Sequence, residues 1–182
     1  MLKAIGIIEC KTISKGYQLS DAILDLVSVE IIMAQPICPG KFVLILAGGV
    51  AEIENAVSFA KQEFGPFVID STVLGRIEEE VYLSLIGATE PQQRDAIGMV
   101  ETFSIAAVIQ AADTAVKTSG VEIVEIRIAR GMGGKCYVLF TGSVSNVEDA
   151  VKNSSVQAAE EGMLVDTAVI ASPHEDLWQY IE

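Results

Sequence analysis

The stretch AIGIIE at residues 4–9 recurs as AIGMVE at residues 96–101, which is 92 residues further along the chain. The same spacing relates VEI at residues 29–31 to VEI at residues 121–123. Two later matches lie further apart because the second copy carries short insertions before them. GK at 40–41 matches GK at 134–135, and VID at 68–70 matches LVD at 164–166. Because insertions between periodic segments fall where loops tolerate them, the sequence predicts a tandem duplication of one module of roughly ninety residues.

Apolar spacing within the first copy predicts the elements of that module. Breaks at Pro36, Pro39 and Gly40 separate two of its strands. The expected strands cover residues 4–9, 29–37, 42–46 and 67–74, and the expected helices cover 14–27, 51–64 and 78–85. This β-α-β-β-α-β order with a trailing helix is typical of an α+β, ferredoxin-like fold, an antiparallel sheet with helices on one face.

Two such domains are expected, at residues 1–90 and 91–182, with a linker near 89–94. In the second copy, the helix expected over residues 104–116 is apolar around most of its circumference, which indicates burial on several sides. Small residues on this helix would permit close approach of another element. Contact with another subunit is favoured slightly over burial within the same chain.

The composition limits the classes of partner. The 182 residues are 51% apolar and carry a net charge of −13, which argues against nucleic acid and against an anionic membrane surface. No run of apolar residues is long enough for a spanning helix. Three cysteines do not suggest a disulfide framework, and the default compartment is the cytoplasm.

Motifs for catalysis are weak, so no enzyme activity is expected. The single histidine, His174, follows Pro173 and precedes two acids, a pattern typical of a helix start. The glycine-rich segment at residues 131–135 lacks the spacing of a phosphate-binding loop and leads into a strand. The chain has no nucleophile elbow and no HExxH motif.

The three cysteines differ in their surroundings. Cys10 follows the first expected strand and Cys136 lies inside an apolar strand, where a cysteine is usually a small buried side chain, so both are expected to be unreactive. Cys38 lies at the tip of a turn between two strands, and the nearby Lys41 would favour the thiolate, the form that binds metal. One cysteine cannot hold an iron–sulfur cluster, but a cyclic oligomer with this turn on its axis would bring several together.

Several segments resemble the bacterial microcompartment (BMC) shell-protein domain. They are residues 96–102, 111–117 and 169–174 in the second copy. Two such domains in one chain are similar to the tandem-domain shell proteins. The turns at 38–41 and 131–136 look most like those of the iron–sulfur-binding tandem shell proteins of propanediol-utilisation compartments.

The resemblance implies a homotrimer, a pseudohexameric tile of six domains, which joins other shell proteins in a layer around metabolic enzymes in the cytoplasm. It also implies that Cys38 from each of three chains holds one [4Fe-4S] cluster at the axis, for electron transfer across the shell or for repair of enclosed enzymes. A redox enzyme is then a possible partner. The residues expected around the cluster or pore are Pro39, Gly40, Lys41, Arg130, Gly131, Met132, Gly133 and Gly134.

Arg130 is the residue paired with Cys38 by the 92-residue spacing, and its charge would offset part of a cluster's negative charge. The family's edge contacts map onto Lys117 and Arg76, whose counterparts in the other copy are Asp25 and Ser172. Each copy therefore keeps half of the edge pair.

Two alternatives remain open. The first is a tile whose central pore passes small metabolites without a cluster, with Cys38 either free or holding another metal. The second belongs to another class of protein: a duplicated regulatory module that binds an effector, although no polar pocket motif supports it.

Overall fold

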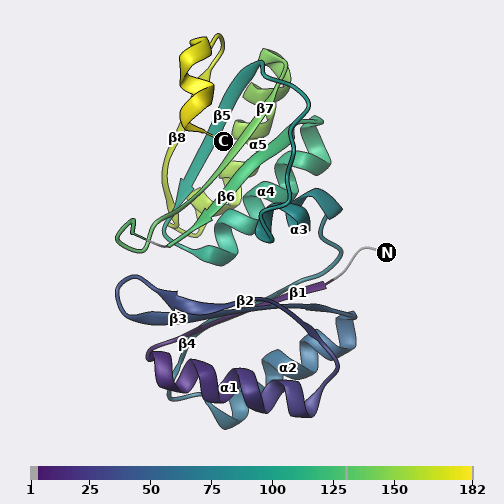
Figure 1. Ribbon diagram of the computed structural model, residues 1–182, viewed down its shortest axis with the longest axis vertical. Helices are drawn as coiled ribbons and strands as arrows, with labels where there is room; N and C mark the ends of the chain where they lie inside the picture. The colour runs from purple at the N-terminus through teal and green to yellow at the C-terminus, as the bar shows by residue number, and fades with distance from the viewer. Residues whose placement is uncertain (1–3, 130, 182) are drawn as a thin grey trace. The chain divides into compact units, whose positions relative to one another are not determined.

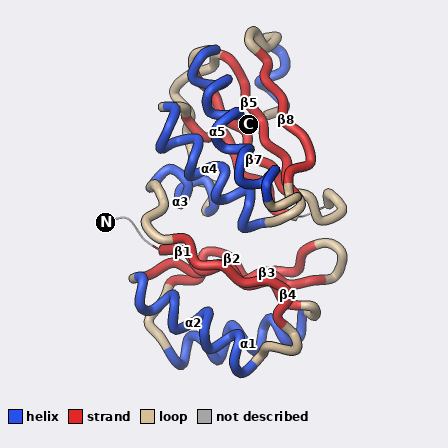
Figure 2. The backbone as a smooth tube through the Cα atoms, turned by 180° about the vertical axis from the view of Figure 1, so that it is seen from behind, coloured by secondary structure: helices blue, strands red, loops and turns tan. Residues whose placement is uncertain are grey.

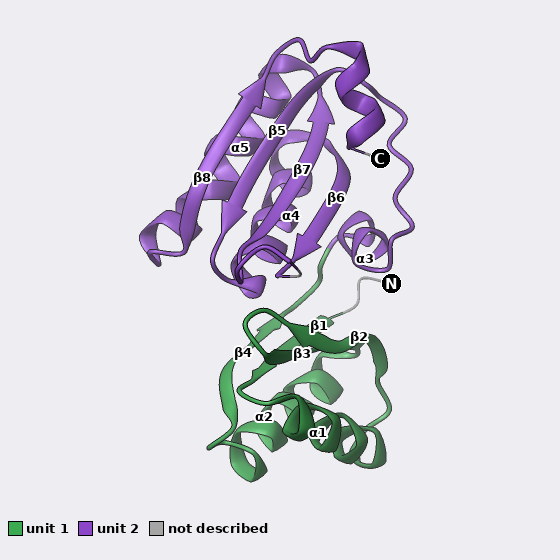
Figure 3. Ribbon diagram, turned by 60° about the vertical axis from the view of Figure 1, so that its left-hand side comes forward, with its two compact units in different colours: residues 1–77 green, residues 78–182 purple. Residues whose placement is uncertain are grey.

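The computed structural model describes residues 4–129 and 131–181. The chain divides into two compact units, residues 1–77 and 78–182, each built on its own four-stranded antiparallel sheet (Figures 1 and 3). The α+β class and the two tandem domains with antiparallel sheets are confirmed. Among the described residues no helix has the length and apolar character needed to cross a membrane.

The first unit has the strand order β2-β3-β1-β4. Two helices lie on one side of this sheet (Figure 2). Its elements are β1 (Ala4–Cys10), α1 (Ile13–Leu26), β2 (Glu30–Ile37), β3 (Lys41–Gly48), α2 (Val50–Glu63) and β4 (Val68–Leu74). Each begins and ends within a few residues of the range expected from apolar spacing.

The second unit repeats this plan, with the strand order β6-β7-β5-β8. Its elements are α3 (Glu79–Leu85), β5 (Ala96–Thr102), α4 (Ile105–Ser119), β6 (Glu122–Ile128), β7 (Cys136–Gly142), α5 (Val144–Glu160), β8 (Leu164–Ile170) and the 3-10 helix η1 (Glu175–Tyr180). The edge strands even share an irregularity: the register shifts between Ile31 and Met33 in β2 and between Ile123 and Glu125 in β6.

Alternate residues of the first sheet form the core beneath its helices. Ala4, Ile8 and Cys10 of β1 are fully or almost fully buried there. They pack with residues of β3, α1 and α2, which include Phe42, Leu44, Leu46, Leu19, Ile23, Ile53, Ala56, Val57 and Ala60. The two-residue periodicity of the strands and the helical periodicity of α1 and α2 therefore meet in one apolar layer.

Helix α4 is buried on several sides, as its apolar sequence predicts. Ser104 caps its first turn by accepting a hydrogen bond from the backbone of Ala107, and Gly120 ends it in the left-handed conformation. Alanines on its inner face allow α5 to approach closely. This packing lies within one unit, and contact of α4 with another subunit stays a prediction.

Helix α3 follows the first copy in sequence but packs in the second unit. Its Val81 and Leu85 are buried, and the helix lies against β6 and α4. The segment beyond it is tied to the same strand, because the Thr89 hydroxyl donates a hydrogen bond to the carbonyl of Val124 at 2.9 Å. The compact units therefore divide at residues 77 and 78, earlier in the chain than the division at residue 90 expected from the sequence.

Candidate functional site

The turn between β2 and β3 carries Cys38 at its tip. The backbone N–H of Gly40 donates a hydrogen bond to the carbonyl of Ile37 at 2.9 Å, which closes the turn. Gly40 has a φ of 81°, in the left-handed region that favours glycine. The Cys38 side chain is half-buried and in no disulfide, while Pro39 and Gly40 are exposed. The turn therefore presents one thiol at the end of a β-hairpin.

An ion pair lies at the base of this turn. The Nζ atom of Lys41, on β3, lies 3.3 Å from Oε2 of Glu9, on the neighbouring strand β1. Glu9 is the one charged residue among the buried residues that the structure describes. The ammonium group of Lys41, which the sequence places near Cys38, therefore has this carboxylate as a partner.

The turn between β6 and β7 is longer and has a different tip. The backbone N–H of Lys135 donates to the carbonyl of Met132, and that of Ala129 donates to the carbonyl of Lys135. The glycines at 131, 133 and 134 all have positive φ angles. Arg130, the residue paired with Cys38 by the repeat, lies outside the described residues.

The second turn has the same ion pair at its base. Nζ of Lys135 lies 3.7 Å from Oε2 of Glu101. Lys41 and Glu9 occupy the same places in the first unit, yet sequence reasoning did not single out either glutamate. The signal was available, because GK and the glutamate that ends AIGIIE both recur in the second copy.

The other two cysteines are fully buried. Burial raises the pKa of the Cys10 thiol to about 11, so this side chain remains protonated near neutral pH. Cys136 lies opposite Thr102 at the start of β7. Cys38 is therefore the cysteine whose position suits a metal ligand.

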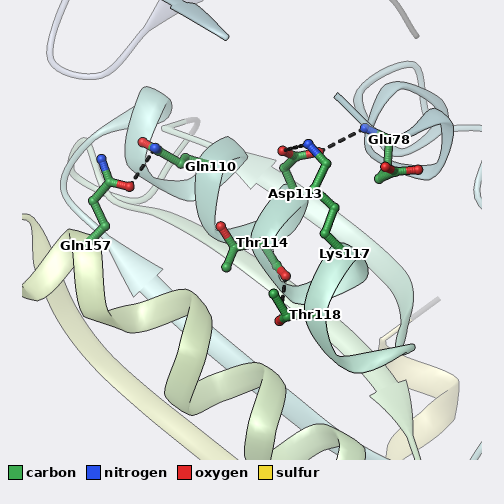
Figure 4. A network of polar contacts seen from close by, with 7 residues as sticks. All are labelled: Glu78, Gln110, Asp113, Thr114, Lys117, Thr118 and Gln157. Carbon is green, nitrogen blue, oxygen red and sulfur yellow. Dashed lines mark hydrogen bonds and ion pairs between the residues drawn. The ribbon is translucent and has the colours of Figure 1, made fainter. Parts of the chain in front are cut away.

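The predicted edge residues occupy different kinds of position. Lys117 lies on α4, and its Nζ contacts Oδ2 of Asp113 at 2.5 Å (Figure 4). Asp113 also accepts a hydrogen bond through Oδ1 from the backbone N–H of Glu78 at 2.9 Å. Arg76 is exposed in the segment after β4, with a φ of 55°. The sequence did not reveal that Asp113 holds the start of α3.

A hollow of about 590 Å³ lies in the second unit between α3, the segment after it, and β6. Two of its charged side chains bind each other, since Nε of Arg127 lies 2.5 Å from Oε2 of Glu125. The Tyr137 hydroxyl donates to the same carboxylate at 2.6 Å, and burial is the main cause that raises the pKa of Tyr137 to about 12. These groups are satisfied by one another, so they do not favour the effector-binding alternative.

Within the described residues of one chain, no three His, Cys, Asp or Glu side chains gather in a group that could hold a metal ion. Cys38, which is half-buried, is the only one of the three cysteines that is not fully buried. Iron–sulfur clusters are held by several thiolates. The donor set fits such a cluster only where symmetry places Cys38 side chains of several chains together.

Comparison with known proteins identifies the family. The BMC domain matches residues 4–77 and again residues 96–173. The chain is 42% identical over 179 residues to the bacterial microcompartment shell protein PduT of Citrobacter freundii, covering 98% of this chain and 97% of that protein.

Solved structures agree with this result. The crystal structure of a microcompartments protein from Desulfitobacterium hafniense DCB superimposes with a TM-score of 0.94 at 40% identity, covering 98% of this chain and 99% of that one. A fused, permuted hexameric shell protein of the RMM microcompartment has a TM-score of 0.64 at 16% identity, over 87% of this chain and 84% of that chain, and shows the fold alone. The chain belongs to the BMC-domain family, as a tandem-domain shell protein with a structural rather than an enzymatic role.

Proposed function

We propose that three copies of this chain form one tile of a microcompartment shell and that their Cys38 thiolates together hold a [4Fe-4S] cluster. The position of Cys38 supports this proposal, because a half-buried thiol at the tip of a hairpin is free to meet its symmetry mates. Three thiolates serve four irons, which leaves one iron for a ligand that the protein does not supply. When bound, the cluster supplies reversible one-electron transfer.

The duplication fits a threefold site. Two domains per chain give a trimer six similar turns, but only the first turn carries a cysteine. Below it, the Lys41–Glu9 ion pair joins β3 to β1 and steadies the base of the hairpin. The chain therefore holds the thiol on ordered strands while leaving its tip accessible.

The role that we propose for the tile is electron transfer between the interior and the exterior of the compartment. In the proposed trimer, the turns of the first and second copies would alternate around the axis. The second copy has Arg130 where the first has Cys38, and its positive charge would raise the reduction potential of an anionic cluster. A redox enzyme is the corresponding partner, and other shell proteins surround the tile. The supporting observation remains the single half-buried thiol per chain at the tip of a hairpin.

Anaerobic purification followed by iron and sulfide analysis tests the proposal. We expect about four iron and four sulfide per three chains, in protein that sediments as a trimer, and loss of both in Cys38→Ser. Cys10→Thr is the matched control, because the second copy already carries Thr102 at that place. It should keep the iron.

The outcomes separate the alternatives. A trimer that stays iron-free after anaerobic reconstitution contradicts the cluster and favours a tile with a metabolite pore. Iron that survives in Cys38→Ser contradicts the ligand assignment. A wild-type chain that sediments as a monomer contradicts the tile.

A further inference from the structure

The hollow in the second unit lies where the chain passes along the free edge of a sheet. β6 is an edge strand, so no further strand of the unit pairs with its outer side. The segment after α3 runs beside β6 instead (Figure 3). It is held at two points, by the hydrogen bond from Thr89 to Val124 and by one of 2.6 Å from the N–H of Gln92 to Oε2 of Glu122. Because the segment does not pair along the strand, a hollow of about 590 Å³ remains, which suits a small organic molecule.

Most of the wall of this hollow is apolar. Leu85 of α3 and Val124 and Ile126 of β6 are buried residues that line it, and Pro91 and Ile181 line it with half-buried side chains. An apolar molecule that contacts these side chains leaves water, which favours binding. The wall therefore favours a ligand with an apolar body.

The charged groups at the hollow do not favour an ion as the ligand. Arg127 and Glu125 form an ion pair of 2.5 Å with each other. Glu90 is the third charged residue in the wall and adds a negative charge. The net charge is thus negative, which disfavours an anion, and a cation would lose its water shell against a mostly apolar wall. The ligand that fits is uncharged.

A buried hydroxyl group in the same wall has no partner. Ser84 of α3 lines the hollow and is 7% exposed, and its Oγ atom makes no hydrogen bond among the described residues. Buried polar groups in proteins nearly always have a partner, because an unsatisfied group keeps the cost of leaving water. A ligand in the hollow would supply the missing partner.

A second hydroxyl group in the wall can only accept. Thr89 donates its one hydroxyl hydrogen to the carbonyl of Val124, so its remaining capacity is that of an acceptor. Ser84 still has a hydrogen to donate. A ligand hydroxyl group can both accept and donate, whereas an ether only accepts. The two side chains therefore match an alcohol better than an ether or a hydrocarbon.

We propose that the hollow between α3, the segment after it and β6 binds a small, uncharged alcohol with an apolar body. The apolar part of the ligand lies against Leu85, Val124 and Ile126, and its hydroxyl group meets Ser84. The site belongs to one unit of one chain. It needs neither the trimer nor the cluster, so it gives the shell protein a ligand-binding function that involves neither of the two turns described above.

Photoaffinity labelling of the full chain tests the site. The probe is a benzyl alcohol that carries a trifluoromethyl diazirine in the para position, and the comparison is the benzoic acid with the same group. We expect the alcohol to label peptides that contain residues 84–91 or 124–127, with a yield that saturates and that excess benzyl alcohol suppresses. The acid is an anion at neutral pH and should label these peptides several-fold less.

Matched serine variants test the hydroxyl contact. In Ser84→Ala, the concentration of the alcohol probe that gives half-maximal labelling should rise about fivefold, which is the effect of one lost neutral hydrogen bond. Ser154→Ala is the control, because Ser154 is also a buried serine without a hydrogen-bond partner among the described residues but does not line the hollow. It should bind the probe as the wild type does. Benzyl methyl ether should displace the probe less well than benzyl alcohol.

Stability without the probe gives a further measurement. Because the Ser84 hydroxyl has no partner, Ser84→Ala should unfold at the same urea concentration as the wild type or at a higher one. A folded variant that binds the probe more weakly separates a ligand contact from a structural role. A lower unfolding midpoint overturns the premise that this hydroxyl group is unpaired within the chain.

The remaining outcomes each bear on one part of the proposal. Labelling that does not saturate, or that maps to other peptides, overturns the site. Equal labelling by the acid and the alcohol overturns the preference for an uncharged ligand, and equal affinity in Ser84→Ala and wild type overturns the contact with Ser84. Each result is independent of the proposed function, since iron content and sedimentation measure the cluster and the tile.

Discussion

The two units differ at the contact between the first helix of each copy and the strand beneath it: the larger side chain belongs to the strand in the first unit and to the helix in the second. In the first unit, Gly16 of α1 lies directly over the ring of Phe42 on β3, where an added Cβ atom would overlap the ring. The equivalent residues in the second unit are Val108 and Cys136, both fully buried. A large strand residue beneath glycine has become a small strand residue beneath valine. The fold thus conserves the filled volume of a contact rather than the residue at either position.

The aromatic ring has moved along the strand in the second unit. Phe140, which corresponds to Leu46, is fully buried against Gly98 of β5. At Gly6, the equivalent glycine of β1, an added Cβ atom would first meet the smaller side chains of Ile53 and Val57 on α2. Each copy therefore has its own tight contact, although the backbone plan is shared. Substitutions that exchange residues between the copies should expose this difference.

The largest effect is expected from Gly16→Val, which brings the residue of the second copy into the first. The valine would overlap Phe42, so we expect a loss of about 3 kcal/mol or more in the free energy of unfolding. Urea unfolding followed by circular dichroism measures it. In the double variant Gly16→Val with Phe42→Cys, most of that loss should be recovered. A double variant no more stable than the single one would contradict the volume exchange.

The second effect compares the thiols of the turn and the strand. On metal-free protein at pH 8, we expect alkylation of Cys38 to be about a hundredfold faster than that of Cys10. A pKa of about 11 leaves about one Cys10 thiol in a thousand ionised at that pH. Mass spectrometry of digested, alkylated protein measures both rates.

The pH dependence of Cys10 has a defined sign. Its folded-state pKa lies above the ordinary value of 9.0, so the unfolded chain loses this proton first as the pH rises. Native stability should therefore fall between about pH 9 and pH 11, and less so in Cys10→Thr. Equal alkaline sensitivity of both proteins would show that Cys10 is not the cause.

A smaller effect should distinguish the two strand glycines. Gly98→Ala places a methyl group against the Phe140 ring and should cost about 1–3 kcal/mol of unfolding free energy. Gly6→Ala meets Cγ2 of Ile53 at 3.0 Å and Cγ2 of Val57 at 3.3 Å, and these side chains can shift slightly. Its loss should be the smaller of the two. The reverse order in thermal denaturation would mean that Phe140 moves more easily than the α2 side chains.

The smallest effect concerns the first turns of α4 and α1. Ser104→Ala removes the cap of α4 and should destabilise the protein by about 0.5–1 kcal/mol. Thr12 stands at the same place before α1 but makes no capping hydrogen bond, so Thr12→Ala should change stability by a few tenths of a kcal/mol at most. Equal losses in urea unfolding would indicate that Thr12 caps α1 in solution.

Much of the fold follows from the sequence because the repeat gives each pattern twice. The matching stretches at 4–9 and 96–101 fixed the central strands, and apolar spacing placed the helices within a few residues. The position of Cys38 at a turn follows from Pro39 and Gly40, which interrupt two strand-like runs. Apolar spacing and turn residues act within a short segment of the chain, so they can be interpreted without knowing which distant residues the segment contacts.

Long-range contacts could not be predicted in the same way. The apolar spacing of Val81 and Leu85 predicts a helix but does not say which sheet it covers. The sequence therefore provided no reason to group this helix with the second copy, with which it forms one compact unit. The Lys41–Glu9 pair spans two neighbouring strands, and although both residues recur in the second copy, the recurrence does not show that they contact each other. Their pairing depends on strand register, which only the folded sheet supplies.

The ion pairs Glu9–Lys41 and Glu101–Lys135 hold the two hairpins at their bases, below tips that differ in length and chemistry. Because the base is the same in both units, a change at the tip need not disturb the register of the strands. Variation in this family can then be confined to the few residues between the base positions, as it is between the antigen-binding loops of antibodies. For protein engineering, residues 38–40 can then be replaced by other metal-binding or redox-active turns while the strands on either side keep their register.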